Sequence, residues 1–167
     1  MSKKPSSKAL SHFDETGNAR MVDVGAKDVT ERMAVACATI TMQAATLKLI
    51  ATKKAAKGDV LAVAQLAGIM AAKKTPDLIP LCHPLSLSSV DVKLSIDAKR
   101  NAVNVEATCR LKGRTGVEME ALTAASVAAL TVYDMCKTAD RTMSIGELML
   151  WEKTGGSSGM WKRDAGV

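Results

Sequence analysis

Residues 89–111 read SVDVKLSIDAKRNAVNVEATCRL, and this stretch decides the fold. Apolar and polar side chains alternate over residues 90–96 and again over residues 103–111, and the polar run DAKRN separates the two segments. Alternation with a period of two is typical of a strand with one buried face. A short polar run between two such segments indicates a turn. The sequence therefore predicts an antiparallel hairpin.

The segments on either side of this hairpin supply further elements. Residues 32–42 alternate with a period of two and contain Val, Ile and Thr, which predicts a strand, although their alanines leave a helix possible. Asp59 is placed to cap a helix that stops near Pro76. The expected elements are a strand at 32–42, helices at 43–56, 59–74 and 117–137, the hairpin, and a strand at 143–151.

This order predicts an α+β fold. If the first two helices count as one crossover, the pattern is β-α-β-β-α-β, the ferredoxin-like arrangement, with an extra helix in the first crossover and an antiparallel sheet. Its length of 167 residues fits one domain. We expect a disordered tail at 1–11, one catalytic domain at 12–159 beginning with a looped arm, and a flexible tail at 160–167.

Composition narrows the class of protein. The net charge is +6, which favours an anionic partner. No apolar run approaches the roughly 20 residues that a membrane span needs, and the first ten residues lack the apolar core of a secretory signal. The four cysteines form no CxxC pair, so reduced thiols in the cytoplasm are expected.

One candidate for chemistry is the segment DLIPLCHPL at 77–85. Prolines on both sides of Cys82 and His83 stiffen the backbone and fix where these side chains point. An imidazole held in this way suits acid–base catalysis, while a hydrogen-bonded structural histidine is the ordinary alternative. A zinc site is disfavoured because no second Cys or His lies at finger-like spacing.

The helix expected at 117–137 carries charges near both ends of a small, apolar run. Glu118 and Glu120 lie near its start, and Asp134 and Lys137 lie three residues apart near its end. At about 1.5 Å per residue, Glu120 and Asp134 are about 21 Å apart along the axis. One helix therefore cannot bring both into one small site, so the two ends serve different purposes or a second subunit joins them.

Two lysines lie beside glycines. Lys57 precedes Gly58 between two helices, and Lys153 precedes the run TGGSSG. A solvated lysine is the common interpretation of each, while an amine next to a glycine-rich loop can also hold phosphate. The loop GRTG at 113–116 enters a helix and is a further, unspecific anion site.

Four stretches together resemble the MoaC family, the cyclic pyranopterin monophosphate synthases of molybdenum cofactor biosynthesis. They read PDLIPLCHPLSLSSV, KGRTGVEMEALTAASVAALTVYDMCK, KGDVLAVAQLAGI and MVDVGAK, and the likeness extends over about residues 12–159. The resemblance implies a ferredoxin-like subunit in a hexamer, a trimer of dimers with active sites at the dimer interfaces. It also implies a lyase that converts 3′,8-cyclo-7,8-dihydro-GTP to cyclic pyranopterin monophosphate and releases diphosphate. No cofactor and no metal site are expected, and whether a divalent ion assists with the triphosphate stays open.

The resemblance also implies roles for single residues. Lys57 and Lys137 match catalytic lysines, Asp134 a positioning carboxylate and His83 a pocket histidine. The substrate-binding positions implied by the resemblance are Cys82, Glu118, Glu120, Arg32 and Lys153. We expect the two lysines to act as general acid and base, since burial can lower the pKa of an amine.

Two other classes of function stay open. A ferredoxin-like nucleic-acid-binding module agrees with the charge, but aromatic residues for base stacking make up only 2% of the chain. A structural domain that forms oligomers agrees with the alanine-rich helix but leaves His83, Asp134 and Lys137 without a role.

Overall fold

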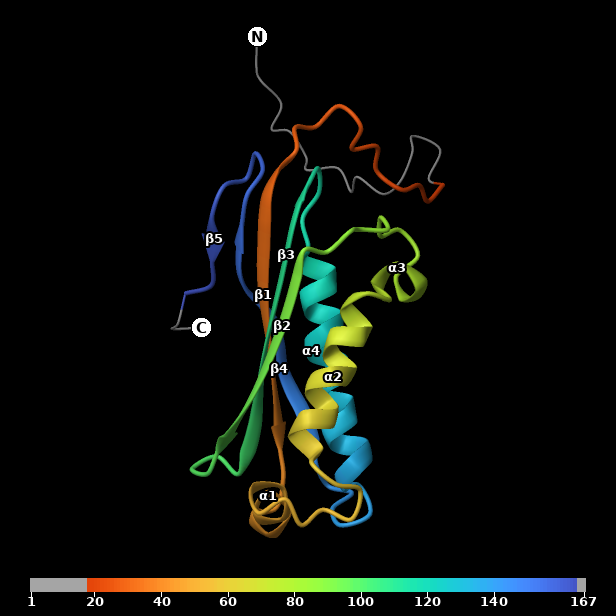
Figure 1. Cartoon of the computed structure of the whole chain (residues 1–167). Coiled ribbons are helices and arrows are strands. Elements are labelled where there is room, and N and C mark those ends of the chain that lie inside the picture. The colour runs from red at the N-terminus through yellow and green to blue at the C-terminus, as the bar shows by residue number, and fades with distance from the viewer. Residues whose placement is uncertain (1–17, 165–167) are drawn as a thin grey trace.

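The computed structural model describes residues 18–164. One antiparallel sheet carries helices on one of its faces (Figure 1). The elements are β1 (Thr30–Thr41), α1 (Ala44–Ala51), α2 (Val60–Ala72), α3 (Thr75–Leu78), β2 (Ser89–Asp97), β3 (Ala102–Gly113), α4 (Glu118–Cys136), β4 (Ser144–Thr154) and β5 (Trp161–Lys162).

The hairpin predicted at residues 89–111 is confirmed. β2 and β3 pair in antiparallel register from Ser89 opposite Arg110 to Asp97 opposite Ala102. Asp97 also closes the turn, because its Oδ1 accepts hydrogen bonds from the backbone N–H groups of Lys99 (3.0 Å) and Arg100 (3.1 Å). An Asp that bonds the backbone two and three residues ahead is a local turn former.

The strand order is β2-β3-β1-β4-β5. β3 lies between β1 and β2 in the sheet. The connection from β1 to β2 therefore crosses over β3, as in the ferredoxin-like arrangement. The α+β class and the antiparallel sheet are confirmed. α3 and β5 extend the six-element pattern.

Small side chains build the core between the sheet and the helices. Ala34, Ala36 and Ala38 on β1 are at most 1% exposed, and five alanines of α4 are fully buried. Such side chains let α2, α4 and the sheet approach closely, and a Cβ added at Gly68 would lie 3.0 Å from the Ala124 carbonyl oxygen. Close helix packing thus fills the core of a chain that has few aromatic side chains.

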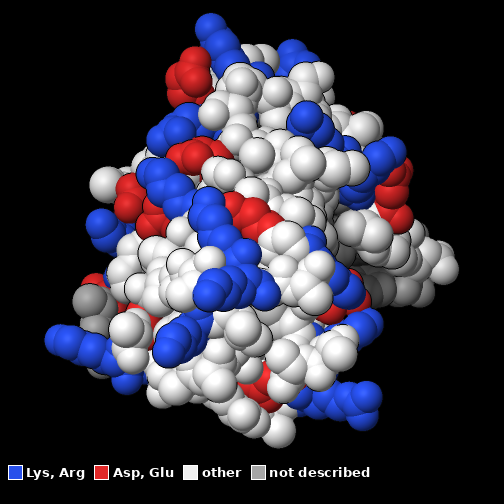
Figure 2. All heavy atoms as spheres, turned by 60° about the horizontal axis from the view of Figure 1, so that its bottom comes forward, with Lys and Arg blue, Asp and Glu red and all other residues white. Residues whose placement is uncertain are grey.

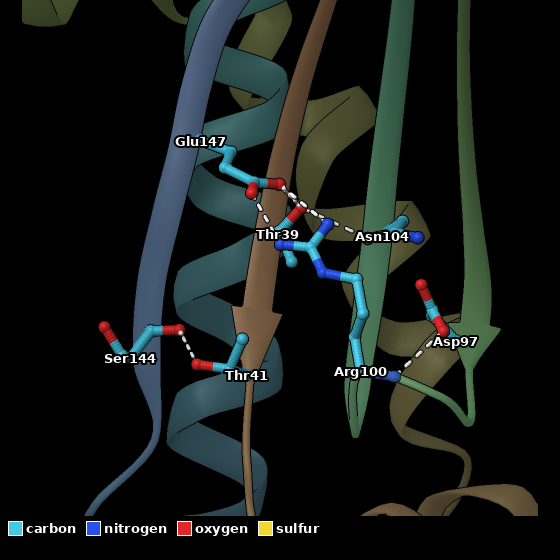
Figure 3. A network of polar contacts seen from close by, with 7 residues as sticks. All are labelled: Thr39, Thr41, Asp97, Arg100, Asn104, Ser144 and Glu147. Carbon is cyan, nitrogen blue, oxygen red and sulfur yellow. Dashed lines mark hydrogen bonds and ion pairs between the residues drawn. The ribbon is translucent and has the colours of Figure 1, made fainter.

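The opposite face of the sheet carries a polar network (Figure 3). Glu147 has a φ of 50° where the pairing of β1 with β4 shifts register. Its carboxylate accepts hydrogen bonds from the Thr39 hydroxyl (2.8 Å) and the Arg100 guanidinium (3.2 Å). The same hydroxyl oxygen lies 3.1 Å from Asn104 Oδ1, a second polar contact. These bonds tie three strands and the hairpin turn together at the irregularity.

Several element boundaries differ from expectation. α1 ends at Ala51, not residue 56, and α2 ends at Ala72. Pro76 lies in the first turn of α3, where a missing backbone N–H leaves no helical bond unmade. The sequence did not predict β5, which pairs with β4 inside the stretch expected to be a flexible tail.

The expected tail at 1–11 and the start of the arm at 12–17 lie outside the described residues. From residue 18 to residue 29 the arm is irregular, as expected. No helix in the described part of the chain is long and apolar enough to cross a membrane.

Candidate active site

The candidate residues gather at the two ends of α4. Arg32, Glu118 and Lys153 lie at its first turn and are called the first-turn cluster. Lys57, Asp134 and Lys137 lie at its other end and are called the last-turn cluster. Sixteen residues separate Glu118 from Asp134, which places them about 24 Å apart along the helix axis.

Asp134 is the centre of the last-turn cluster. Its Oδ1 lies 2.6 Å from Lys137 Nζ, and its Oδ2 lies 3.0 Å from Lys57 Nζ. Lys57 Nζ also donates to the backbone carbonyl of Asp134 at 3.0 Å. One carboxylate therefore fixes two amines that come from different elements.

The ion pairs set the charge states of this cluster. Hydrogen bonds from Lys137 and then from Lys57 lower the pKa of Asp134 below its usual range. The hydrogen bond to Asp134 raises the pKa of Lys137. The sequence argument expected burial to lower it, but the Lys137 side chain is 51% exposed in the single chain, and the carboxylate dominates. The ion pair therefore favours the ammonium form of Lys137 in the single chain.

Lys57 of the last-turn cluster lines a cavity of about 360 Å³ with mostly apolar walls. Leu49 of α1, Ala55 and Ala56 of the following loop, and Met135 of α4 contribute to it. Figure 2 views this end of the molecule and shows Lys and Arg side chains gathered across it, with fewer acidic ones between them. The end suits an anion that carries a flat or apolar portion.

The first-turn cluster lies in a larger, polar cavity of about 620 Å³. Lys153 Nζ lies 2.8 Å from Glu118 Oε1. The Arg32 guanidinium donates to the backbone carbonyls of Gly113 and Arg114, both at 3.4 Å. These contacts hold both cations at the cavity wall.

Glycines allow the backbone to approach Arg32 in this cavity. Gly156 has a φ of 72°, and a Cβ there would collide with the Arg32 guanidinium. Thr30 also lines the cavity, and its buried Oγ1 finds no hydrogen-bond partner among residues 18–164. Buried polar atoms are nearly always paired, so a bound ligand is a fitting partner for this hydroxyl.

Sequence reasoning missed two cations of this cavity, Lys27 and Arg114. Arg114 Nε donates to the Lys27 carbonyl at 3.0 Å, which ties the N-terminal arm to the GRTG loop. The loop was noted as an anion site and the arm as part of a motif. Neither observation predicted that the arm contacts the loop, because Lys27 and Arg114 are 87 positions apart in sequence.

Glu120, Cys82 and His83 do not line this cavity. Glu120 is 3% exposed, and burial, followed by the nearby Glu118 carboxylate, raises its pKa. Burial likewise raises the pKa of the Cys82 thiol, with Glu120 as the second cause. His83 Nε2–H donates to the Val22 carbonyl at 2.8 Å, so the imidazole fastens the N-terminal arm in this chain.

No group of three or more His, Cys, Asp or Glu side chains in the described part of the molecule is arranged to hold a metal ion.

The fold and the two clusters define a class of protein: a small α+β chain with acid–base groups and a cation-lined cavity fit for an anionic small molecule. The model of the MoaC family matches residues 21–156. The chain therefore belongs to the MoaC family, which acts in molybdenum cofactor biosynthesis.

Relatives named cyclic pyranopterin monophosphate synthase resemble nearly the whole chain. The protein of Rhodospirillum rubrum is 61% identical over 152 residues, which cover 91% of this chain and 92% of that protein. The protein of Parvibaculum lavamentivorans is 60% identical over 155 residues, covering 93% and 97%. The protein of Roseiflexus castenholzii is 61% identical over 150 residues, covering 90% and 95%.

Proposed function

We propose that this chain is a lyase that converts 3′,8-cyclo-7,8-dihydro-GTP to cyclic pyranopterin monophosphate and releases diphosphate. The observation that carries the proposal is the coexistence of a carboxylate-centred pair of amines and a cavity lined by Lys27, Arg32, Arg114 and Lys153. Rearrangement of a nucleotide ring needs proton donors and acceptors, and a triphosphate needs cations.

In this proposal the first-turn cluster binds the phosphates. Arg32 presents a planar set of donors that suits phosphate oxygens. Lys153 exchanges its contact with Glu118 for a phosphate oxygen, and Lys27 and Arg114 add positive charge at the same wall. Glu118, which lines this cavity, binds the substrate together with Glu120 and Cys82, and His83 takes part in catalysis.

The last-turn cluster moves the protons. Lys57 and Lys137, which share Asp134, act as the general acid and base. Asp134 keeps both amines within reach of one reacting atom.

The separation of the clusters requires two chains in one site. A triphosphate nucleotide cannot bridge about 24 Å of helix within one subunit and still bring its ring to the amines. We propose that the first-turn cluster of one subunit faces the last-turn cluster of its partner, in a hexamer built as a trimer of dimers. We also propose a cytoplasmic location, where the chain's free cysteines stay reduced.

The test is to incubate the purified protein with 3′,8-cyclo-7,8-dihydro-GTP and to follow diphosphate release together with the pterin product by mass spectrometry. Stoichiometric formation of both supports the lyase. The cationic end shown in Figure 2 also suits a nucleic acid. Salt-sensitive RNA binding without any diphosphate release would favour that alternative and end the lyase proposal.

A further inference from the structure

The loop that carries Lys57 is closed by an ion pair that no catalytic role explains. We propose that Lys53 and Asp59 are positioning residues, whose ion pair closes the loop at 53–59 and holds the Lys57 amine against Asp134. The inference rests on the proposed role of Lys57.

The backbone at Lys53 is the first sign that this side chain is needed. Lys53 has a φ of 54°, a left-handed conformation that helices usually give to glycine at their C-terminal end. The closing bonds run from Lys54 N to the Leu49 carbonyl (3.0 Å) and from Lys53 N to the Ile50 carbonyl (3.1 Å). A lysine in a place that glycine would occupy without strain indicates a use for its side chain.

That use is the contact with Asp59. Lys53 Nζ lies 2.7 Å from Asp59 Oδ2, while Asp59 Oδ1 accepts the backbone N–H of Ala62 at 3.2 Å and caps α2. The hydrogen bond between the pair raises the pKa of Lys53 and lowers that of Asp59. One carboxylate thus anchors the end of the loop to the start of α2 and to the end of α1.

The remaining loop is too short to move freely once its ends are fixed. Gly58 N–H donates to the Ala55 carbonyl at 3.0 Å, forming a turn with Lys57 inside it. Lys57 Nζ then meets both the carboxylate and the carbonyl of Asp134. The Lys53 side chain is 72% exposed, and exposed pairs add little to stability. Its effect is therefore on where Lys57 lies.

Two substitutions separate placement from folding. Lys53→Gly removes the pair but suits the positive φ, so the protein should unfold at the same or a higher temperature. Asp59→Asn removes the charge but keeps an oxygen to cap α2. We expect each to lower kcat/KM about tenfold, because small misplacements of a catalytic group are expensive in rate. Lys53→Arg keeps a cation that can pair with Asp59 and should retain the wild-type kcat/KM.

The matched control is Asp91→Asn, which breaks another exposed Lys–Asp pair, that with Lys93 (3.4 Å). It should leave kcat/KM within about twofold of the wild type. A double-mutant cycle gives the decisive readout, because Asp59→Asn should have no effect on turnover once Lys57→Ala is present. If Asp59→Asn lowers the residual activity of Lys57→Ala tenfold as well, the pair acts elsewhere and the proposal is wrong.

A second measurement does not depend on turnover. Brief acetylation followed by peptide mass spectrometry reports how accessible each lysine amine is in the native protein. Lys57 should react roughly threefold faster in Lys53→Gly and Asp59→Asn, with Lys48 unchanged, once its hold on Asp134 loosens. Unchanged reactivity of Lys57 would overturn the positioning role. If Lys57 reacts faster in both variants but the wild type shows no lyase activity, the result contradicts the proposed lyase function and leaves the positioning role intact.

Discussion

The two ends of α4 are built on different physical principles. At the first turn, Glu120 is 3% exposed and Glu118 and Lys153 line a polar cavity of about 620 Å³. At the last turn, Asp134 and its two lysines are half exposed and bonded mainly to one another. A walled cavity with several cations suits binding, while a compact ion-paired group suits proton exchange. In the proposed mechanism, the length of one helix separates these two tasks.

The strongest test of this division is Lys57→Ala. Loss of a general acid or base lowers turnover about 10³-fold, while the phosphate-binding end stays intact and KM changes little. Steady-state kinetics on diphosphate release measures both constants. Lys48→Ala, which removes an exposed lysine of α1, serves as the control. A large rise in KM at unchanged kcat would mean that the last turn binds substrate instead.

Mixing two inactive variants tests whether the ends meet across subunits. Lys57→Ala is combined with the double variant Arg32→Ala, Lys153→Ala by refolding the chains together. Half of randomly paired dimers are mixed, and each then holds one intact site of two, so about a quarter of wild-type activity should return. Lys57→Ala mixed with Lys137→Ala places both defects at the same end and should restore none. Equal recovery in both mixtures would contradict the shared site.

Arg32→Ala addresses the binding end with a smaller expected effect. Charge-assisted hydrogen bonds contribute about 1.5–3 kcal/mol, so KM should rise roughly ten- to hundredfold while kcat falls much less. Lys112→Ala, an exposed cation at the end of β3, is the control. The comparison between the ends fails if Arg32→Ala lowers kcat as strongly as Lys57→Ala does.

Local patterns account for what could be predicted of the fold. The hairpin, β1, α4 and the Asp59 cap depend on neighbouring residues, and the structure has each of them. β5 could not be predicted, because a strand of two residues has no periodicity and exists only by pairing with β4. The sequence analysis interpreted Pro76 as the end of a helix, yet a proline is tolerated in the first turn of a helix, and Pro76 lies in the first turn of α3.

The candidate site likewise has features that the sequence predicted and features that it did not. The charges at the two ends of α4 and their separation follow from helix geometry. The contact of Glu118 with Lys153 and of Arg114 with the Lys27 carbonyl joins residues 35 and 87 positions apart, which no local pattern reveals. The raised pKa of Lys137 also escaped sequence reasoning, since it depends on the exposure and contacts of the folded chain.

The smallest expected effect concerns stability, and its sign differs between the ends. Burial raises the pKa of Glu120, so its stabilising contribution is present below pH 4.5, the usual value, and is lost as pH rises through the folded value. The pKa of Asp134 is lowered, so its contribution is present above pH 3.8 and is lost as pH falls through the folded value. Glu120→Gln should therefore stabilise the protein at pH 7, and Asp134→Asn should destabilise it.

Thermal unfolding followed by circular dichroism at pH 4 and pH 7 checks this contrast. At pH 7, Glu120→Gln should raise Tm by about 2–4 °C, the shift that roughly 1 kcal/mol gives in a chain of this size. The decrease for Asp134→Asn should be smaller, because its ion pairs are exposed to water. The Glu120→Gln difference should shrink at pH 4, below the usual pKa of that carboxyl, while the Asp134→Asn difference should persist there because the pKa of Asp134 is lowered below 3.8. Shifts of the same sign at pH 7 would mean that the two ends do not differ in the electrostatic work of folding.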